Sequence, residues 1–167
     1  AQDVIGIHQH GNFHCVQTGD GKRYSARALL LATGSRYRRL GVPGETDYLG
    51  AGVHFCATCD GPFYKGKTVA VIGGGNSATE ESLLLTKFAD RVTILVRGDA
   101  FTASPVIQEK VLEHEGIDVR WNTEVKAFIG ADSKLSQLRL VNNRTGKENL
   151  LPVDGVFIFI GLDPNTA

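Results

Sequence analysis

Two cysteines separated by two residues are the part of this sequence best suited to chemistry. Cys56 and Cys59 stand at this spacing, and Asp60 follows directly. Thr58, Asp60 and Gly61 favour a tight turn that would hold the two sulfurs within bonding distance. A sulfur at such a turn or at the start of a helix is more easily ionised. The pattern therefore favours a redox-active disulfide.

A zinc half-site and a pair of packed thiols are the alternatives for the two cysteines. Zinc needs two further ligands, and only His54 is close in the sequence. Asp60 is placed to pass a proton to or from a leaving thiolate. Its alternative role is an Asx turn, in which the carboxylate accepts a hydrogen bond from the local backbone. Of these possibilities, the residue types favour thiol–disulfide chemistry.

A glycine-rich segment follows the cysteines and directly continues an apolar run at residues 68–72. It reads Gly73, Gly74, Gly75, Asn76, Ser77, Ala78. Gly73 allows a tight turn, Gly75 allows the backbone to approach a pyrophosphate, and Ala78 allows a helix to pack closely on the strand. The free N–H groups and positive dipole end of that helix would face the phosphates. An ordinary glycine-rich loop is the alternative, but the strand before and the helix after favour dinucleotide binding.

The elements around these motifs predict an α/β fold with a Rossmann-like domain. Strands are expected at residues 68–72, 91–96 and 117–121, and helices at 76–88 and from Ser104 and Pro105 onward. Together they form a parallel βαβαβ unit. Shorter strands at 125–129 and 135–141 predict an antiparallel β-meander. The apolar run at 156–160, which ends on Gly161, is expected back in the parallel sheet.

The first part of the chain predicts a β-rich piece of a second domain. Residues 1–34 alternate and turn as a meander, and the apolar run at 28–34 suits a strand buried on both faces. Residues 35–50 are expected to connect the domains. His8, His10, His14 and Cys15 invite a metal site, but no second cluster at zinc spacing accompanies them. We therefore expect solvated histidines and a bystander thiol.

The composition narrows the classes of partner. The 167 residues carry a formal net charge of zero, so no electrostatic argument favours nucleic acid or an anionic membrane. No apolar run has the length of a membrane span, and no signal peptide is recognised, so we expect a cytoplasmic location. The sequence contains no methionine and starts and stops next to strands. We expect it to be a piece of a larger protein.

Several segments together resemble the low-molecular-weight flavin-dependent thioredoxin reductases of the pyridine nucleotide-disulfide oxidoreductase family. They are residues 32–34, 37–45, 52–61, 71–78 and 160–166, and C-A-T-C-D-G shortly ahead of G-G-G-N-S-A is a specific pairing. The resemblance implies three parts. Residues 1–45 would be the end of an incomplete FAD-binding domain with a hinge, 46–161 the NAD(P)H-binding domain with the cysteines, and 162–167 the start of the return hinge.

The resemblance also implies an activity. A homodimeric enzyme would move a hydride from NADPH through FAD to the Cys56–Cys59 disulfide and then reduce thioredoxin. Cys59 would lie next to the flavin, Cys56 would attack the thioredoxin disulfide, and Asp60 would donate the proton. NADPH would contact the segment 73–78, Arg97 and Gly161, and FAD would contact Thr33 and Gly34. The nucleotide domain of this family rotates between two positions, and residues 40–50 and those after Gly161 match its hinges.

Two departures from the family pattern define the alternatives. The glycine fingerprint and the late Gly-Asp segment of the flavin domain are absent, so these residues alone should not hold FAD tightly or turn over. The family's H-R-R-x-x-x-R pattern for NADPH keeps only Arg97, while Asp99 could reach a ribose hydroxyl. We expect NADPH, with NADH or another donor as alternatives. Another acceptor, or a nucleotide-binding module without catalysis, fits the same motifs.

Overall fold

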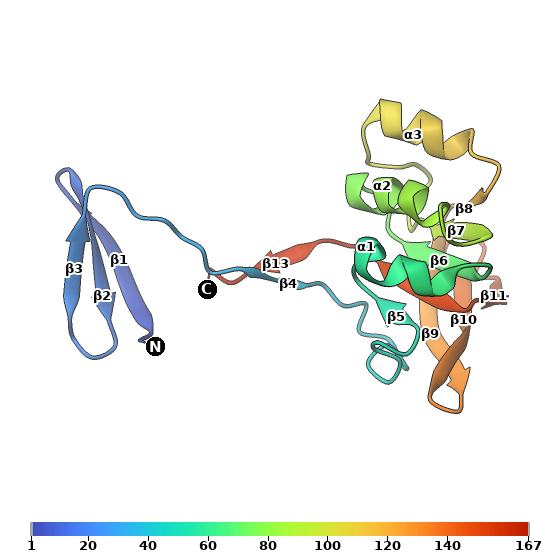
Figure 1. Cartoon of the computed structure of the whole chain (residues 1–167), viewed down its shortest axis with the longest axis horizontal. Coiled ribbons are helices and arrows are strands. Elements are labelled where there is room, and N and C mark those ends of the chain that lie inside the picture. The colour runs from blue at the N-terminus through green and yellow to red at the C-terminus, as the bar shows by residue number, and fades with distance from the viewer. Residues whose placement is uncertain (1, 167) are drawn as a thin grey trace. The chain divides into compact units, whose positions relative to one another are not determined.

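The structure is a computed structural model that describes residues 2–166 (Figure 1). The described residues form two compact units. The meander unit contains the segment up to Ser35 and the segment from Pro164 onward, and the sheet unit is Arg36–Asp163. Each unit is described by itself below.

The meander unit is a three-stranded antiparallel sheet. Its strands β1 (Val4–His10), β2 (Phe13–Thr18) and β3 (Arg23–Ala26) pair in sequence order, as predicted. The predicted buried strand at residues 28–34 is wrong. These residues form no strand, and Leu30 is 87% exposed. A strand in a sheet interior needs neighbours for its backbone groups, and the described residues place none beside this run.

The centre of the sheet unit is a five-stranded parallel sheet. Its order is β5 (Val53–His54), β12 (Gly155–Ile158), β6 (Thr68–Ile72), β7 (Arg91–Leu95) and β8 (Ile117–Arg120). Helix α2 (Asn76–Leu85) connects β6 to β7, and α3 (Pro105–Leu112) connects β7 to β8. The predicted βαβαβ unit is confirmed, and so is the return of the run at 156–160 to the parallel sheet. Strand β5 was not predicted, because two residues carry no periodic pattern.

Both faces of this sheet are buried, and the alternation along each strand decides what each face contacts. On β6, Val71 belongs to the core formed with helices α2 and α3, which also contains Leu85 and Val111. The next residue, Ile72, belongs to the opposite core, which contains Leu138 of the antiparallel sheet. The parallel strands are therefore apolar without a break, because helices cover one face and strands cover the other.

The antiparallel sheet consists of β9 (Thr123–Ala131), β10 (Lys134–Asn142) and β11 (Glu148–Pro152), in the order β11-β10-β9. Strand β11 was not predicted. The segment before β5 also docks on this sheet. The Phe128 N–H donates to the Pro43 carbonyl (2.9 Å), and the Leu135 N–H donates to the Ala51 carbonyl (3.1 Å). Much of the predicted connection at residues 35–50 is thus fixed within the sheet unit.

Three short elements complete the fold. Helix α1 (Ala57–Asp60) and the 3-10 helix η1 (Gly61–Tyr64) follow β5. Strand β4 (Ser35–Tyr37) pairs with β13 (Leu162–Pro164) where the chain passes between the two units. Within residues 2–166, no helix has the length and apolar character needed to cross a membrane. The same residues contain no cluster of three His, Cys, Asp or Glu side chains that could hold a metal ion.

Candidate active site

The cysteine pair lies at the start of a one-turn helix. Cys56 has an extended backbone and caps α1, two residues after the end of β5. Its Sγ accepts a hydrogen bond from the Cys59 N–H (3.2 Å), and the two residues form a disulfide with Cα atoms 5.3 Å apart. Cys59 is exposed and Cys56 is half-buried. The predicted disulfide at a helix start is confirmed, and one of its sulfurs faces solvent.

Packing against α2 holds this short helix in place. Ala57 is fully buried. Gly61 lies so close to the end of α2 and the residues after it that a Cβ atom there would stand 3.3 Å from Leu85 and 3.0 Å from Phe88. A single helical turn is not stable alone, because fixing the backbone of the first turn costs more conformational free energy than one hydrogen bond contributes. The contacts at Gly61 therefore help to keep the disulfide at a defined position.

The Asp60 carboxylate pairs with an imidazole and does not form the alternative Asx turn. Its Oδ2 atom lies 3.2 Å from Nδ1 of His54, and it caps no local backbone N–H. His54 is buried, which lowers the pKa of its imidazole, while the negative charge of Asp60 opposes that shift. Nε2 of His54 lies 2.6 Å from the hydroxyl of Tyr64. Sequence reasoning weighed His54 solely as a zinc ligand and did not single out Tyr64, because no local pattern joins them.

The glycine turn has the shape that a dinucleotide requires. Gly73 has φ +143°, and a Cβ atom there would collide with the Phe159 carbonyl oxygen and stand 2.9 Å from Cβ of Ala78. Gly75 differs, because the nearest neighbour of a Cβ atom there is a Thr102 hydroxyl at 3.7 Å. Gly73 is thus required by the protein's own packing. The space beside Gly75 remains for a ligand.

The beginning of α2 supplies the groups that could hold a pyrophosphate. Its first N–H groups, from Asn76, Ser77 and Ala78, have no acceptor within the helix. The Asn76 side chain does not compete for them, since its Oδ1 accepts a hydrogen bond from the Ser104 N–H (2.7 Å). Free N–H groups and the helix dipole together favour an anion at this end.

The parallel register brings these groups to one edge of the sheet. Ile72 pairs with both Leu95 and Ile158, and His54 pairs with Phe157, so four strands end together. The chain then leads to Gly73 after β6, Cys56 after β5 and Arg97 after β7. The crevice outside the carboxyl ends of parallel strands is where open α/β sheets bind ligands.

Arg97 is exposed at this edge, and a second guanidinium lies in the same region. The Asn143 side chain donates to the Arg97 carbonyl (2.7 Å), and Arg144 pairs with Asp99 at 2.6 Å. Arg144 comes from the turn after β10, far away in the sequence, so sequence reasoning missed it. Asp99 was considered as a ribose ligand, but its carboxylate is bound to Arg144.

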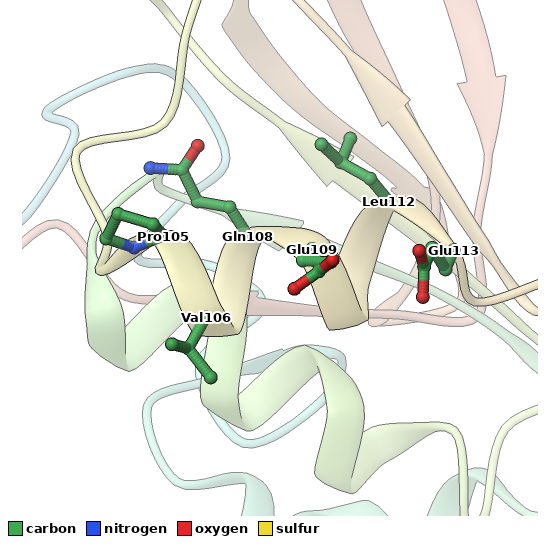
Figure 2. Close-up of a pocket in the computed structure, with 6 residues that line it drawn as sticks. All are labelled: Pro105, Val106, Gln108, Glu109, Leu112 and Glu113. Carbon is green, nitrogen blue, oxygen red and sulfur yellow. The ribbon is translucent and has the colours of Figure 1, made fainter.

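The remaining predicted residues lie close in the sequence to the two points where the chain crosses from one unit to the other. Thr33 and Gly34 belong to the meander unit, where their carbonyls accept hydrogen bonds from Asn165 at 3.1 and 3.0 Å. Gly161 belongs to the sheet unit, and its carbonyl accepts from the Arg38 N–H (3.1 Å). A pocket on the sheet unit contains none of the predicted residues (Figure 2). It is lined by Pro105, Val106, Gln108, Glu109, Leu112 and Glu113. Its two carboxylates make it a poor site for a phosphate.

Comparison with known proteins gives a consistent result. The sequence pattern of the pyridine nucleotide-disulphide oxidoreductases matches residues 1–167. A thioredoxin reductase of Listeria innocua is 44% identical over 149 residues, which are 89% of this chain and 47% of that protein. A thioredoxin reductase of Treponema pallidum is 43% identical over 166 residues, which are 99% of this chain and 53% of that protein. The chain therefore spans about half the length of these relatives.

Solved structures agree with the sequence comparison. The crystal structure of Lactococcus lactis thioredoxin reductase in its FR conformation matches with a TM-score of 0.83 and 37% identity. The match covers 98% of this chain and 54% of that one. The arrangement of strands and helices described above is thus shared with a protein of known structure.

Proposed function

Because this chain belongs to the pyridine nucleotide-disulphide oxidoreductase family, we propose that it carries the nicotinamide-binding part of a flavin-dependent thioredoxin reductase. One observation carries the proposal. The Cys56–Cys59 disulfide stands at the same sheet edge as the Gly73–Gly75 turn. A dinucleotide site and a reducible disulfide are the two parts that a pyridine nucleotide-dependent disulfide reductase must combine.

The residues of the chain then have distinct tasks. NADPH and FAD, when bound, supply the two electrons that convert the disulfide to a dithiol. The Cys56 thiolate attacks a disulfide of thioredoxin or a thioredoxin-like protein, and one substrate sulfur leaves as a thiolate. The Cys59 thiolate then attacks Cys56, re-forms the Cys56–Cys59 bond and releases the second substrate sulfur. Asp60 takes protons from the enzyme thiols and passes them to the leaving sulfurs.

The geometry supports the proposed contacts of NADPH, and the family resemblance supports those of FAD. The pyrophosphate of NADPH would lie against Gly74, Gly75 and the first N–H groups of α2, where no Cβ atom blocks it. Gly161 follows β12 at the same edge. FAD would contact Thr33 and Gly34, whose assignment rests on the family resemblance. The same resemblance supports a homodimer in the cytoplasm, and the division into an FAD-binding part up to residue 45 and an NAD(P)H-binding part from 46 to 161.

Arg97 is the residue on which the preference for NADPH depends. It follows β7 by two residues, and no carboxylate closes that strand. A 2′-phosphate pairs well with a guanidinium, whereas an NAD-selective site presents an acidic side chain to the ribose. Asp99 is engaged by Arg144, which makes it a weaker candidate for that role. NADH and a different disulfide acceptor remain the alternatives.

Substituting Arg97 tests this proposal in the complete protein. Arg97→Ala should raise KM for NADPH about 10-fold to 100-fold, because a charge-assisted pair contributes about 1.5–3 kcal/mol. KM for NADH should change less than about twofold, since NADH lacks the 2′-phosphate. Thioredoxin reduction is the measurement.

Arg91→Ala is the matched control, because Arg91 lies at the opposite end of β7 and is also exposed. It should leave both KM values unchanged. An unaltered KM for NADPH in Arg97→Ala would remove Arg97 from the site, and a parent protein that reduces no disulfide with either nucleotide would refute the function itself.

A further inference from the structure

His54 joins the disulfide segment to the core of the sheet unit through a close contact with the Asp60 carboxylate and a hydrogen bond with Tyr64. It is the last residue of β5 and is 8% exposed. Its Nδ1 atom lies 3.2 Å from Oδ2 of Asp60, and its Nε2 atom lies 2.6 Å from the Tyr64 hydroxyl. The ring of Phe157 lies 5.3 Å from the His54 ring and 5.5 Å from the Tyr64 ring, centre to centre. The imidazole is therefore fixed in position and in orientation.

The partners of His54 determine which of its nitrogens carries the proton. A carboxylate that carries no proton can only accept, so the Nδ1 atom that faces Asp60 is the nitrogen that carries the proton. A neutral imidazole then has its acceptor at Nε2, and the Tyr64 hydroxyl donates to it. Burial lowers the pKa of His54, although Asp60 opposes this, so the neutral form is favoured. The donors thus point in one direction, from the Tyr64 hydroxyl to His54 and from Nδ1 of His54 toward Asp60.

Tyr64 cannot be the source of protons for this chain of hydrogen bonds. Burial, with smaller contributions from the charges of Asp60 and Asp154, raises the pKa of Tyr64 to about 12. Removing its proton near neutral pH would be very unfavourable. A second constraint holds the ring, because a Cβ atom on Gly155 would overlap the Tyr64 ring. Tyr64 therefore locks the tautomer of His54, and Asp60 is the member of this group that stands next to the cysteine pair in the sequence.

We propose that His54 is a positioning residue for thiol–disulfide exchange, which orients the Asp60 carboxyl group beside the cysteine pair. This inference rests on the proposed function. Because Oδ2 faces Nδ1 of His54, the exchanged proton is directed to Oδ1, for which the described residues provide no hydrogen-bond partner. Asp60 takes a proton from an enzyme thiol and returns it to the leaving thiolate of the substrate. Asp60 and His54 are thus unchanged after each cycle.

Two substitutions separate this role from simple core packing. The side-chain amide of Asn can replace the Nδ1–H donor of histidine, whereas the amide of Gln reaches the place of Nε2. His54→Asn therefore keeps the bond to Asp60, and His54→Gln keeps the bond to Tyr64. A packing role would tolerate the larger Gln at least as well as Asn, because Asn leaves more empty volume. The positioning role requires the opposite order.

The experiment uses the complete flavin-loaded protein with the cysteines reduced by dithiothreitol, which is then removed. Rapid mixing with 5,5′-dithiobis(2-nitrobenzoic acid), and separately with a bacterial thioredoxin, measures exchange without NADPH. His54→Asn should react within about threefold of the parent. His54→Gln and His54→Phe should react about 10-fold to 100-fold more slowly, the range expected when a supporting partner of a reacting group is lost. Tyr64→Phe should fall between these values.

The reduction of the flavin by NADPH, followed by its absorbance, is the second measurement. It should stay within about twofold of the parent in every variant, because the inferred role affects only the later proton transfer. Equal exchange rates for His54→Asn and His54→Gln, or a parent-like rate for His54→Phe, would overturn the inference. Failure of NADPH to bleach the flavin of the parent would instead refute the proposed function, and the dithiothreitol experiment would still decide the role of His54.

Discussion

At the scale of single residues, titratable side chains in the sheet unit are held in two different ways. His54 is buried and each of its ring nitrogens has a polar partner. These contacts compensate for the water that the nitrogens lose on burial. Glu81 on α2 is the opposite case. Its Oε2 atom is buried and, among the described residues, has no hydrogen-bond partner. Burial, with a smaller contribution from Glu80, raises the pKa of Glu81.

This difference predicts how stability depends on pH. A pKa of Glu81 that is higher in the folded than in the unfolded protein means that ionisation disfavours folding. The resulting cost begins as the pH rises above 4.5, the ordinary pKa of a glutamate side chain, and is complete above the pKa of Glu81 in the folded protein. Glu81→Gln should therefore raise the melting temperature at pH 7.5 and leave it unchanged near pH 4.

Glu80→Gln is the matched control for this prediction, since Glu80 is exposed on the same helix. Glu80→Gln should raise the melting temperature at pH 7.5 by less than Glu81→Gln does. It removes only the charge of Glu80, which is the smaller cause of the raised pKa of Glu81, and leaves the burial of Glu81 unchanged. Thermal unfolding of the complete protein at both pH values provides the measurement. A lower melting temperature for Glu81→Gln at pH 7.5 would show that the carboxylate has a favourable partner.

At the scale of elements, the connection from β6 to α2 separates two uses of glycine. Gly73 has a backbone conformation that side chains rarely adopt and lies against Phe159 of the segment after β12. Gly75 has φ −90°, which any residue can adopt, and has space beside it. The first glycine is needed for the fold. We infer that the second is needed for the ligand.

This contrast predicts opposite consequences for two similar substitutions. Gly73→Ala should destabilise the complete protein by about 1–3 kcal/mol, because the added methyl group collides with backbone and forces an unfavourable φ. Gly75→Ala should change stability by less than about 0.5 kcal/mol. It should weaken NADPH binding by about 10-fold or more, since its methyl group would occupy the space of the pyrophosphate.

Denaturant unfolding and fluorescence titration with NADPH measure the two effects separately. If Gly75→Ala binds NADPH like the parent, the pyrophosphate does not lie against this turn. If Gly73→Ala is as stable as the parent, the close approach of β6 and the segment after β12 is not required for folding.

At the scale of the whole molecule, the chain carries one complete sheet unit and a small meander. The parallel sheet has a core on each face, whereas the meander unit leaves Leu30 and Leu31 exposed at 87% and 61%. A three-stranded sheet with exposed leucines beside it buries little apolar surface of its own and is at best marginally stable without further packing. The chain spans about half the length of its relatives.

We therefore expect flavin binding to need the complete protein. The polypeptide of residues 1–167 should purify without bound flavin, because only Thr33 and Gly34 are proposed to contact it. The complete protein should show a flavin absorption band that bleaches when NADPH is added. Absorption spectra of the two preparations test this expectation, and a stoichiometric flavin band in the shorter polypeptide would contradict it.

Local patterns in the sequence were sufficient for the cysteine pair, the glycine turn and the order of the longer strands and helices. Cys56 caps a helix through a neighbour three residues away. The turn at Gly73 follows from the local order of strand, glycines and helix, although its contact with Phe159 is not local. Contacts between distant segments decided the rest. His54, Asp60 and Tyr64 are closer in the sequence, but they meet only through the turns of α1 and η1, which no periodic pattern predicts. Arg144 reaches Asp99 only because β10 ends beside β7. Strand β5 is too short for a periodic pattern.

The apolar run at residues 28–34 carried a pattern for a buried strand, but a strand also needs neighbours, which its own residues cannot supply.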